Sequence, residues 1–71
     1  MGKVERLRGD GKAIDERLPT PLYHQIYLIL RDKILGGAYE PMELIPSELE
    51  IAALFKVSRI TAKRALDELA A

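Results

Sequence analysis

Two serines near the C-terminus, Ser47 and Ser58, constrain the fold of this 71-residue chain more than any other feature. Serine is favoured just before a helix because its hydroxyl oxygen accepts a hydrogen bond from an otherwise unpaired N–H group of the first turn. Glu50 follows Ser47 at the spacing of a capping box. The sequence therefore predicts two helices, over about 47–55 and 58–70, joined by a tight turn.

An earlier and longer helix is predicted over about 20–36. Thr20 is a candidate N-cap, and proline, as in Pro21, is favoured at the first helical position because its missing N–H would be unpaired anyway. Gly36 and Gly37 are expected to end the helix. Its apolar side chains share one face: Leu22, Ile26, Ile29, Leu30 and Ile34. The expected fold class is therefore all-α, a three-helix bundle.

The remaining segments are expected to lie outside these helices. Residues 38–46 contain two prolines and form a connector, in which residues 43–45 could be a short edge strand. Residues 1–19 mix charges with three glycines and are interpreted as a flexible leader. Five basic against four acidic residues argue only weakly for a functional basic arm there. The domain is thus predicted to cover residues 20–71.

Composition excludes several classes of function. There are no cysteines, which excludes disulfides and thiolate-bound zinc and fits a reducing compartment. No apolar run approaches the roughly 20 residues that span a bilayer, so we expect no membrane partner and a cytoplasmic location. With His24 as the only histidine, we expect no metal site, no cofactor, no catalytic residue and no enzymatic activity.

Charge is balanced overall but not locally. Eleven basic and eleven acidic residues give a net charge of zero, yet residues 56–64 contain four basic side chains and no acidic one. At 100° per residue, the last helix divides into two sides. Its apolar side holds Ala62, Ala65, Leu66 and Leu69, and its other side holds Arg59, Ile60, Lys63, Arg64 and Asp67. Burial of the first side directs the second towards solvent.

In a helix-turn-helix, the second of two closely spaced helices lies in the major groove of DNA, with its apolar side buried and its basic side facing the DNA. The last predicted helix fits this description. Arginine and lysine suit guanine edges and phosphates, threonine and apolar groups suit the thymine methyl, and a helix N-terminus suits a phosphate. The candidate DNA-binding residues are Lys56, Ser58, Arg59, Ile60, Thr61, Lys63 and Arg64. One alternative is that residues 56–64 are only a solvated helix face, and for Ile60 alone the alternative is an internal packing role. The rival function is a helical protein–protein interaction module. That module would use Leu28, Leu35, Leu49 and Ile60 as anchors.

Several motifs carry a family resemblance that covers positions 21 to 66. They are Pro21-Leu22-Tyr23-x-Gln25-Ile26, Leu30-Arg31-x-x-Ile34-x-x-Gly37, Pro41-x-x-Leu44-Ile45-Pro46-Ser47-Glu48, Val57-Ser58-Arg59-x-Thr61 and Ala65-Leu66. In order and spacing they resemble the N-terminal winged helix-turn-helix domain of GntR-family bacterial transcription regulators, with some similarity to the HutC-like branch. The resemblance implies that Arg59, Ile60, Thr61 and Lys63 face the operator. It also implies a repressor that acts as a homodimer and binds a small-molecule effector through a C-terminal domain.

Three departures from the family pattern stand out. Leu49 occupies the position where the family usually has an arginine, so one expected DNA contact is absent. Met42 replaces a usual glycine. The chain stops at Ala71, before the expected two-stranded wing and the effector domain. We therefore expect a winged helix-turn-helix with the wing truncated, as a fragment of a longer regulator.

Overall fold

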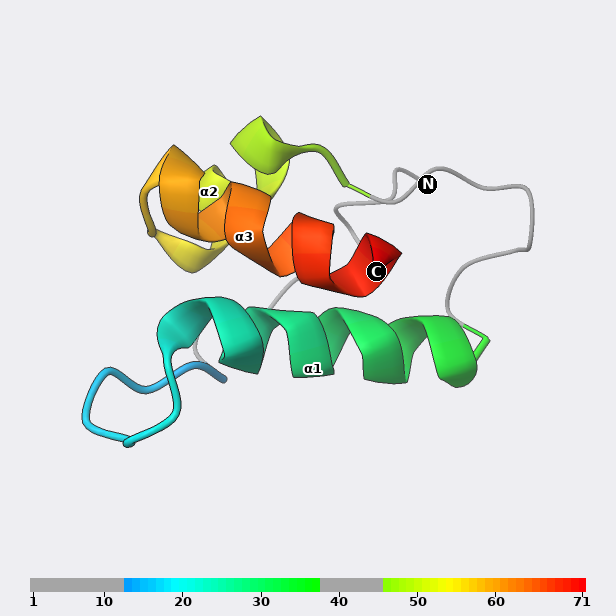
Figure 1. Cartoon of the computed structure of the whole chain (residues 1–71), viewed down its shortest axis with the longest axis horizontal. Helices are drawn as coiled ribbons and strands as arrows, with labels where there is room; N and C mark the ends of the chain where they lie inside the picture. The colour runs from blue at the N-terminus through cyan, green and yellow to red at the C-terminus, as the bar shows by residue number, and fades with distance from the viewer. Residues whose placement is uncertain (1–12, 38–45) are drawn as a thin grey trace.

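The computed structural model describes residues 13–37 and 46–71, and these form three helices without a strand. The helices are α1 (Leu22–Leu35), α2 (Glu48–Phe55) and α3 (Arg59–Ala70). Helix α3 lies along α1 and packs against α2 on another side (Figure 1). The expected all-α class is confirmed for the described residues. The expected connector strand at residues 43–45 lies outside them.

The beginning of α1 differs from the prediction. Pro21 is the N-cap, with φ −56° and ψ 146°, and the helix begins one residue later, at Leu22. Neither Thr20 as the N-cap nor Pro21 as the first helical residue is correct, because the Pro21 carbonyl already accepts the N–H groups of His24 and Gln25 at 3.1 Å each. The glycine ending is confirmed. The Gly36 N–H bonds the Asp32 carbonyl at 2.8 Å, and Gly37 adopts the left-handed conformation with φ 82°.

Both serine caps are confirmed. Ser47 Oγ accepts the Glu50 N–H at 3.3 Å, and Glu50 Oε1 accepts the Ser47 N–H at 2.9 Å, which completes the capping box. Ser58 Oγ accepts the Thr61 N–H at 3.1 Å. Each serine precedes its helix, so α2 and α3 begin one residue later than the predicted ranges. Between them, Lys56 is left-handed, with φ 56° and ψ 47°.

The core lies where α3 meets the other two helices. Its buried members are Ile26, Leu30, Ile51, Phe55, Ala62 and Ala65. The two alanines are fully buried, and their small side chains let α3 approach its neighbours closely. Leu66 and Leu69 pack against this core from its edge. The predicted apolar side of α3 is thus confirmed, whereas Ile34, predicted on the apolar face of α1, is 37% exposed.

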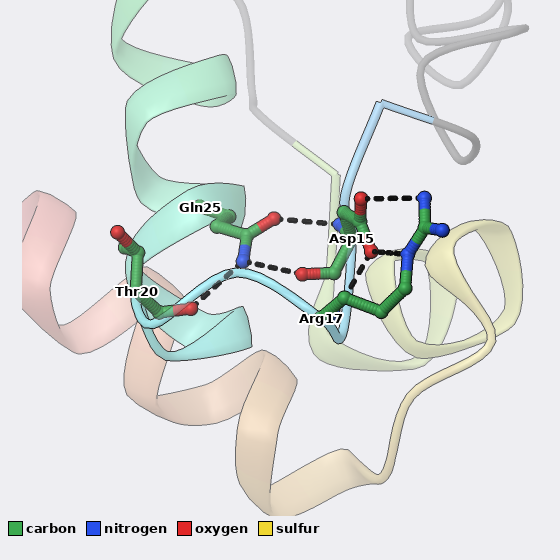
Figure 2. Close-up of polar contacts among 4 residues, drawn as sticks. All are labelled: Asp15, Arg17, Thr20 and Gln25. Carbon is green, nitrogen blue, oxygen red and sulfur yellow. Dashed lines mark hydrogen bonds and ion pairs between the residues drawn. The ribbon is translucent and has the colours of Figure 1, made fainter.

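The segment before α1 is fastened to that helix by one side chain (Figure 2). Gln25 is buried; its Oε1 accepts the Asp15 N–H at 2.8 Å. Its Nε2 donates to the carbonyl oxygens of Asp15 at 3.0 Å and Thr20 at 2.8 Å. Ile14 also packs against the core. The structure therefore differs from the predicted leader over residues 13–19; residues 1–12 lie outside the described part.

A small turn completes this segment. The Asp15 carboxylate accepts the Arg17 backbone N–H at 2.9 Å and the Arg17 Nε–H at 3.1 Å (Figure 2). Hydrogen bonds from the Arg17 side chain, and then from its backbone, lower the pKa of Asp15.

Across residues 13–37 and 46–71, no helix has the length and apolar character to cross a membrane.

Candidate nucleic-acid interface

The outward side of α3 carries what we call the recognition face: Arg59, Ile60, Lys63 and Arg64. All four side chains are exposed, while Ala62 and Ala65 on the opposite side have no exposed surface. The face therefore lies outward because the alanines lie inward. This arrangement depends on the capped start of α3, since the first turn carries Arg59 and Ile60.

Ile60 is the least expected member of this face. Its side chain is 75% exposed although it is a large aliphatic group among charged neighbours. An internal packing role for Ile60 is therefore contradicted. Leu49 on α2 is also exposed, at 60%, and stands where an arginine was expected.

Ser58 and Thr61 differ from the other candidate residues because their hydroxyl groups are hydrogen-bonded to each other. The Ser58 hydroxyl donates to Thr61 Oγ1 at 3.0 Å while it caps the Thr61 N–H. Thr61 is half-buried on the flank of α3. These two residues hold the first turn in place, and Lys56 lies exposed in the turn before it.

Two cations of the recognition face lie beside carboxylates. Lys63 Nζ donates to Asp67 Oδ2 at 2.8 Å, and this hydrogen bond raises the pKa of Lys63. Arg59 Nη2 is 3.9 Å from Glu48 Oε1 at the start of α2. Both pairs are exposed, so they contribute little to folding stability. Their main effect is to reduce the positive potential of the face.

Arg64 has a different partner, which sequence reasoning missed. Its guanidinium carbon lies 4.1 Å from the centroid of the Tyr23 ring on α1. Beside this contact, His24 Nδ1 is 2.7 Å from Glu68 Oε1 on α3. His24 thus forms a polar link between α1 and α3. Helical spacing alone does not show that Tyr23 and Arg64, which are far apart in the sequence, will meet.

The described residues offer little for other chemistry. Among them, no group of three or more histidine, cysteine, aspartate or glutamate side chains is arranged to hold a metal ion. Ser47 and Ser58 act as caps and Glu50 completes a capping box. Within the described residues, the candidate functional site is therefore the basic face of α3.

A short capped helix, a tight turn and a second helix with an outward basic face define a helix-turn-helix. Residues 22–71 match the family model described as bacterial regulatory proteins, gntR family. The chain belongs to this family, and the resemblance seen in its motifs is confirmed.

Curated relatives are named as regulators. The chain is 43% identical over 51 residues to a histidine utilization repressor of Klebsiella aerogenes, covering 72% of the chain and 21% of that protein. It is 39% identical over 56 residues to the HTH-type transcriptional repressor NagR of Bacillus subtilis, covering 79% of the chain and 23% of that protein. A histidine utilization repressor of Pseudomonas aeruginosa is 38% identical over 52 residues, covering 73% and 21%. The chain thus spans about a fifth of the length of these relatives. No solved structure matches it significantly.

Proposed function

We propose that this chain binds duplex DNA in a sequence-specific manner, with α3 in the major groove, as the DNA-binding part of a transcription repressor. The observation that carries the proposal is the division of α3 into a buried alanine side and an exposed basic side. Its twelve residues make a rod about 18 Å long, and a helix of ordinary diameter fits a groove about 12 Å wide.

Different residues of the recognition face would contact different parts of the DNA. Arg59 and Lys63 would contact guanine edges or phosphates, and Ile60 would contact a thymine methyl group. Thr61, on the flank, would add a methyl or edge contact. Lys56 and Arg64 would add attraction to phosphates, and the N-terminus of α3 at Ser58 would face a phosphate.

The regulatory setting is inferred from the relatives. Three of them are named repressors, and repression is the output that we propose for this chain. By the same reasoning we propose a homodimer acting on a palindromic operator in the cytoplasm, with a small-molecule effector bound by a domain outside these residues. The relatives are regulators, which supports a non-enzymatic role.

The test is a binding-site selection from a random duplex library, followed by affinity measurements on the selected duplex. Arg59→Ala should cost about 1–3 kcal/mol of binding free energy and relax the preference at one base position. Arg31→Ala on α1 is the matched control because it removes the same charge away from the recognition face.

The rival function is a helical protein–protein interaction module, which the exposed Leu35, Leu49 and Ile60 favour. If Arg59→Ala leaves the affinity for the selected duplex unchanged while a protein complex is lost, the DNA-binding proposal fails.

A further inference from the structure

We propose that Tyr23 of α1 is a positioning residue that holds Arg64 of α3 ready to bind a DNA phosphate at the edge of the recognition face. This inference rests on the proposed function and extends the DNA-binding site from the helix-turn-helix to α1. Three observations carry it: the ring contact of Arg64, the immobility of that ring, and the occupation of the nearest carboxylate.

The first observation is the contact itself. The Arg64 guanidinium carbon lies 4.1 Å from the Tyr23 ring centroid, well inside the range of a cation–π interaction. Such a contact uses the charge of the guanidinium and leaves its N–H donors available. Arginine has five of these donors in a fixed fork that matches the oxygens of a phosphate. The guanidinium is therefore held in place and still able to bind.

The second observation is that the Tyr23 ring has packing contacts besides the one with Arg64. Tyr23 packs against the hydrophobic core. The neighbouring His24 ring meets it edge to face, with centroids 6.4 Å apart and an interplanar angle of 78°. Because the ring cannot easily move, stacking limits the loss of side-chain entropy when Arg64 binds its ligand.

The third observation concerns Glu68, which stands four residues after Arg64 and is the natural ion-pair partner of that arginine on a helix. Its carboxylate instead lies 2.7 Å from His24 Nδ1. Lys63 shows the other outcome, since its own neighbour at that spacing, Asp67, binds it at 2.8 Å. Within residues 13–37 and 46–71, no carboxylate lies within ion-pair distance of Arg64. His24 thus keeps Arg64 free for DNA by occupying Glu68.

The experiment measures dissociation constants for the selected duplex and for a random duplex over a range of salt concentrations. Arg64→Ala should weaken binding to both duplexes equally and reduce the salt slope by about 0.9. Tyr23→Leu should weaken binding about two- to fivefold in the unaltered protein, and not at all when Arg64 is already alanine. Tyr23→Phe, which keeps the ring, should bind like the unaltered protein.

A second pair of variants tests the role of His24. His24→Ala should release Glu68 to pair with Arg64 and weaken DNA binding. Glu68→Gln should raise the affinity more in the His24→Ala protein than in the unaltered protein, because only without His24 does Glu68 pair with Arg64; a merely structural role of His24 predicts equal gains. This pair keeps the proposal testable if Tyr23→Leu does not fold.

The chain supplies a matched control. Arg31 lies over the Tyr27 ring at 5.7 Å, within α1 alone, so Arg31→Ala should leave DNA affinity unchanged. Equal losses from Tyr23→Leu with and without Arg64 would overturn the proposal, as would equal gains from Glu68→Gln with and without His24. If the unaltered protein binds neither duplex, or Arg59→Ala has no effect, the proposed function fails instead.

Discussion

In the proposed complex, Asp67 would compete with DNA for Lys63. Its carboxylate accepts a hydrogen bond from the Lys63 ammonium group at 2.8 Å, and both side chains are exposed. Because the Lys63 ammonium group has three N–H donors, a base or phosphate would share it with this carboxylate or displace the carboxylate. Asp67 would therefore lower the affinity for every sequence and make selective binding depend more on groups such as Ile60 and Arg59.

Asp67→Asn should raise the affinity for selected and random duplexes by about two- to threefold, because it frees a cation and removes a charge that repels phosphate. The salt dependence should become steeper at the same time. Titration of labelled duplexes measures both effects. Asp32→Asn on α1 makes the same charge change elsewhere, and an equal gain from it would show that Asp67 has no special role.

The protonation of Lys63 gives this pair a definite pH dependence. The hydrogen bond that Lys63 donates to Asp67 raises the pKa of Lys63. From neutral pH up to the ordinary pKa of lysine the contribution of the pair is therefore complete, and it is lost as the pH rises through the raised value. Lys63 consequently keeps its charge throughout the neutral range.

At the level of elements, the turn between α2 and α3 sets the direction of the recognition helix. Lys56 forms it in a left-handed conformation that costs a side-chain-bearing residue about 1–2 kcal/mol. Its N–H still bonds the Ala52 carbonyl, which closes α2. Lysine at this position is thus unfavourable for folding but places a positive charge beside α3, the proposed recognition helix.

Lys56→Gly should raise the free energy of unfolding by about 0.5–1 kcal/mol and weaken DNA binding. Denaturant unfolding and duplex titration measure the two effects separately. Lys56→Asn is the matched variant, since asparagine tolerates the left-handed conformation and also removes the charge. A less stable Lys56→Gly protein would contradict this account of the turn.

Sequence reasoning succeeded for the elements whose signals are local. The Ser47 and Ser58 caps join residues three positions apart, and helical periodicity identified the buried side of α3. It failed where partners are distant in the sequence. Nothing local indicated that Gln25 would bind the backbone of Asp15 or that Tyr23 would meet Arg64. The start of α1 was misplaced by one residue for a local reason, because the Pro21 carbonyl accepts the first N–H groups of the helix.

For the whole molecule, Gln25 links the segment at Asp15 to the three-helix core. A single amide satisfies three backbone groups, two on Asp15 and one on Thr20. This link lets Ile14 cover part of the core, which a domain of this small size needs. The folded unit therefore begins before α1.

Gln25→Leu should lower the free energy of unfolding by about 1–3 kcal/mol, because it leaves partly buried backbone groups without partners. Denaturant unfolding gives the overall loss, and hydrogen exchange locates it. The Asp15 N–H should lose protection, while the Thr61 N–H, capped by Ser58, should keep the protection that the remaining global stability allows. Unchanged exchange at Asp15 would contradict the assigned role of Gln25.

The position of α3 against both other helices has a consequence for how this protein can change. Ala62 and Ala65 are buried, whereas Arg59 and Ile60 are exposed and Arg59 has only an exposed carboxylate, that of Glu48, 3.9 Å away. If these outer residues contact DNA as proposed, substitutions there would change target preference with little effect on the fold. Design or natural selection could then change the target sequence while the fold stays the same.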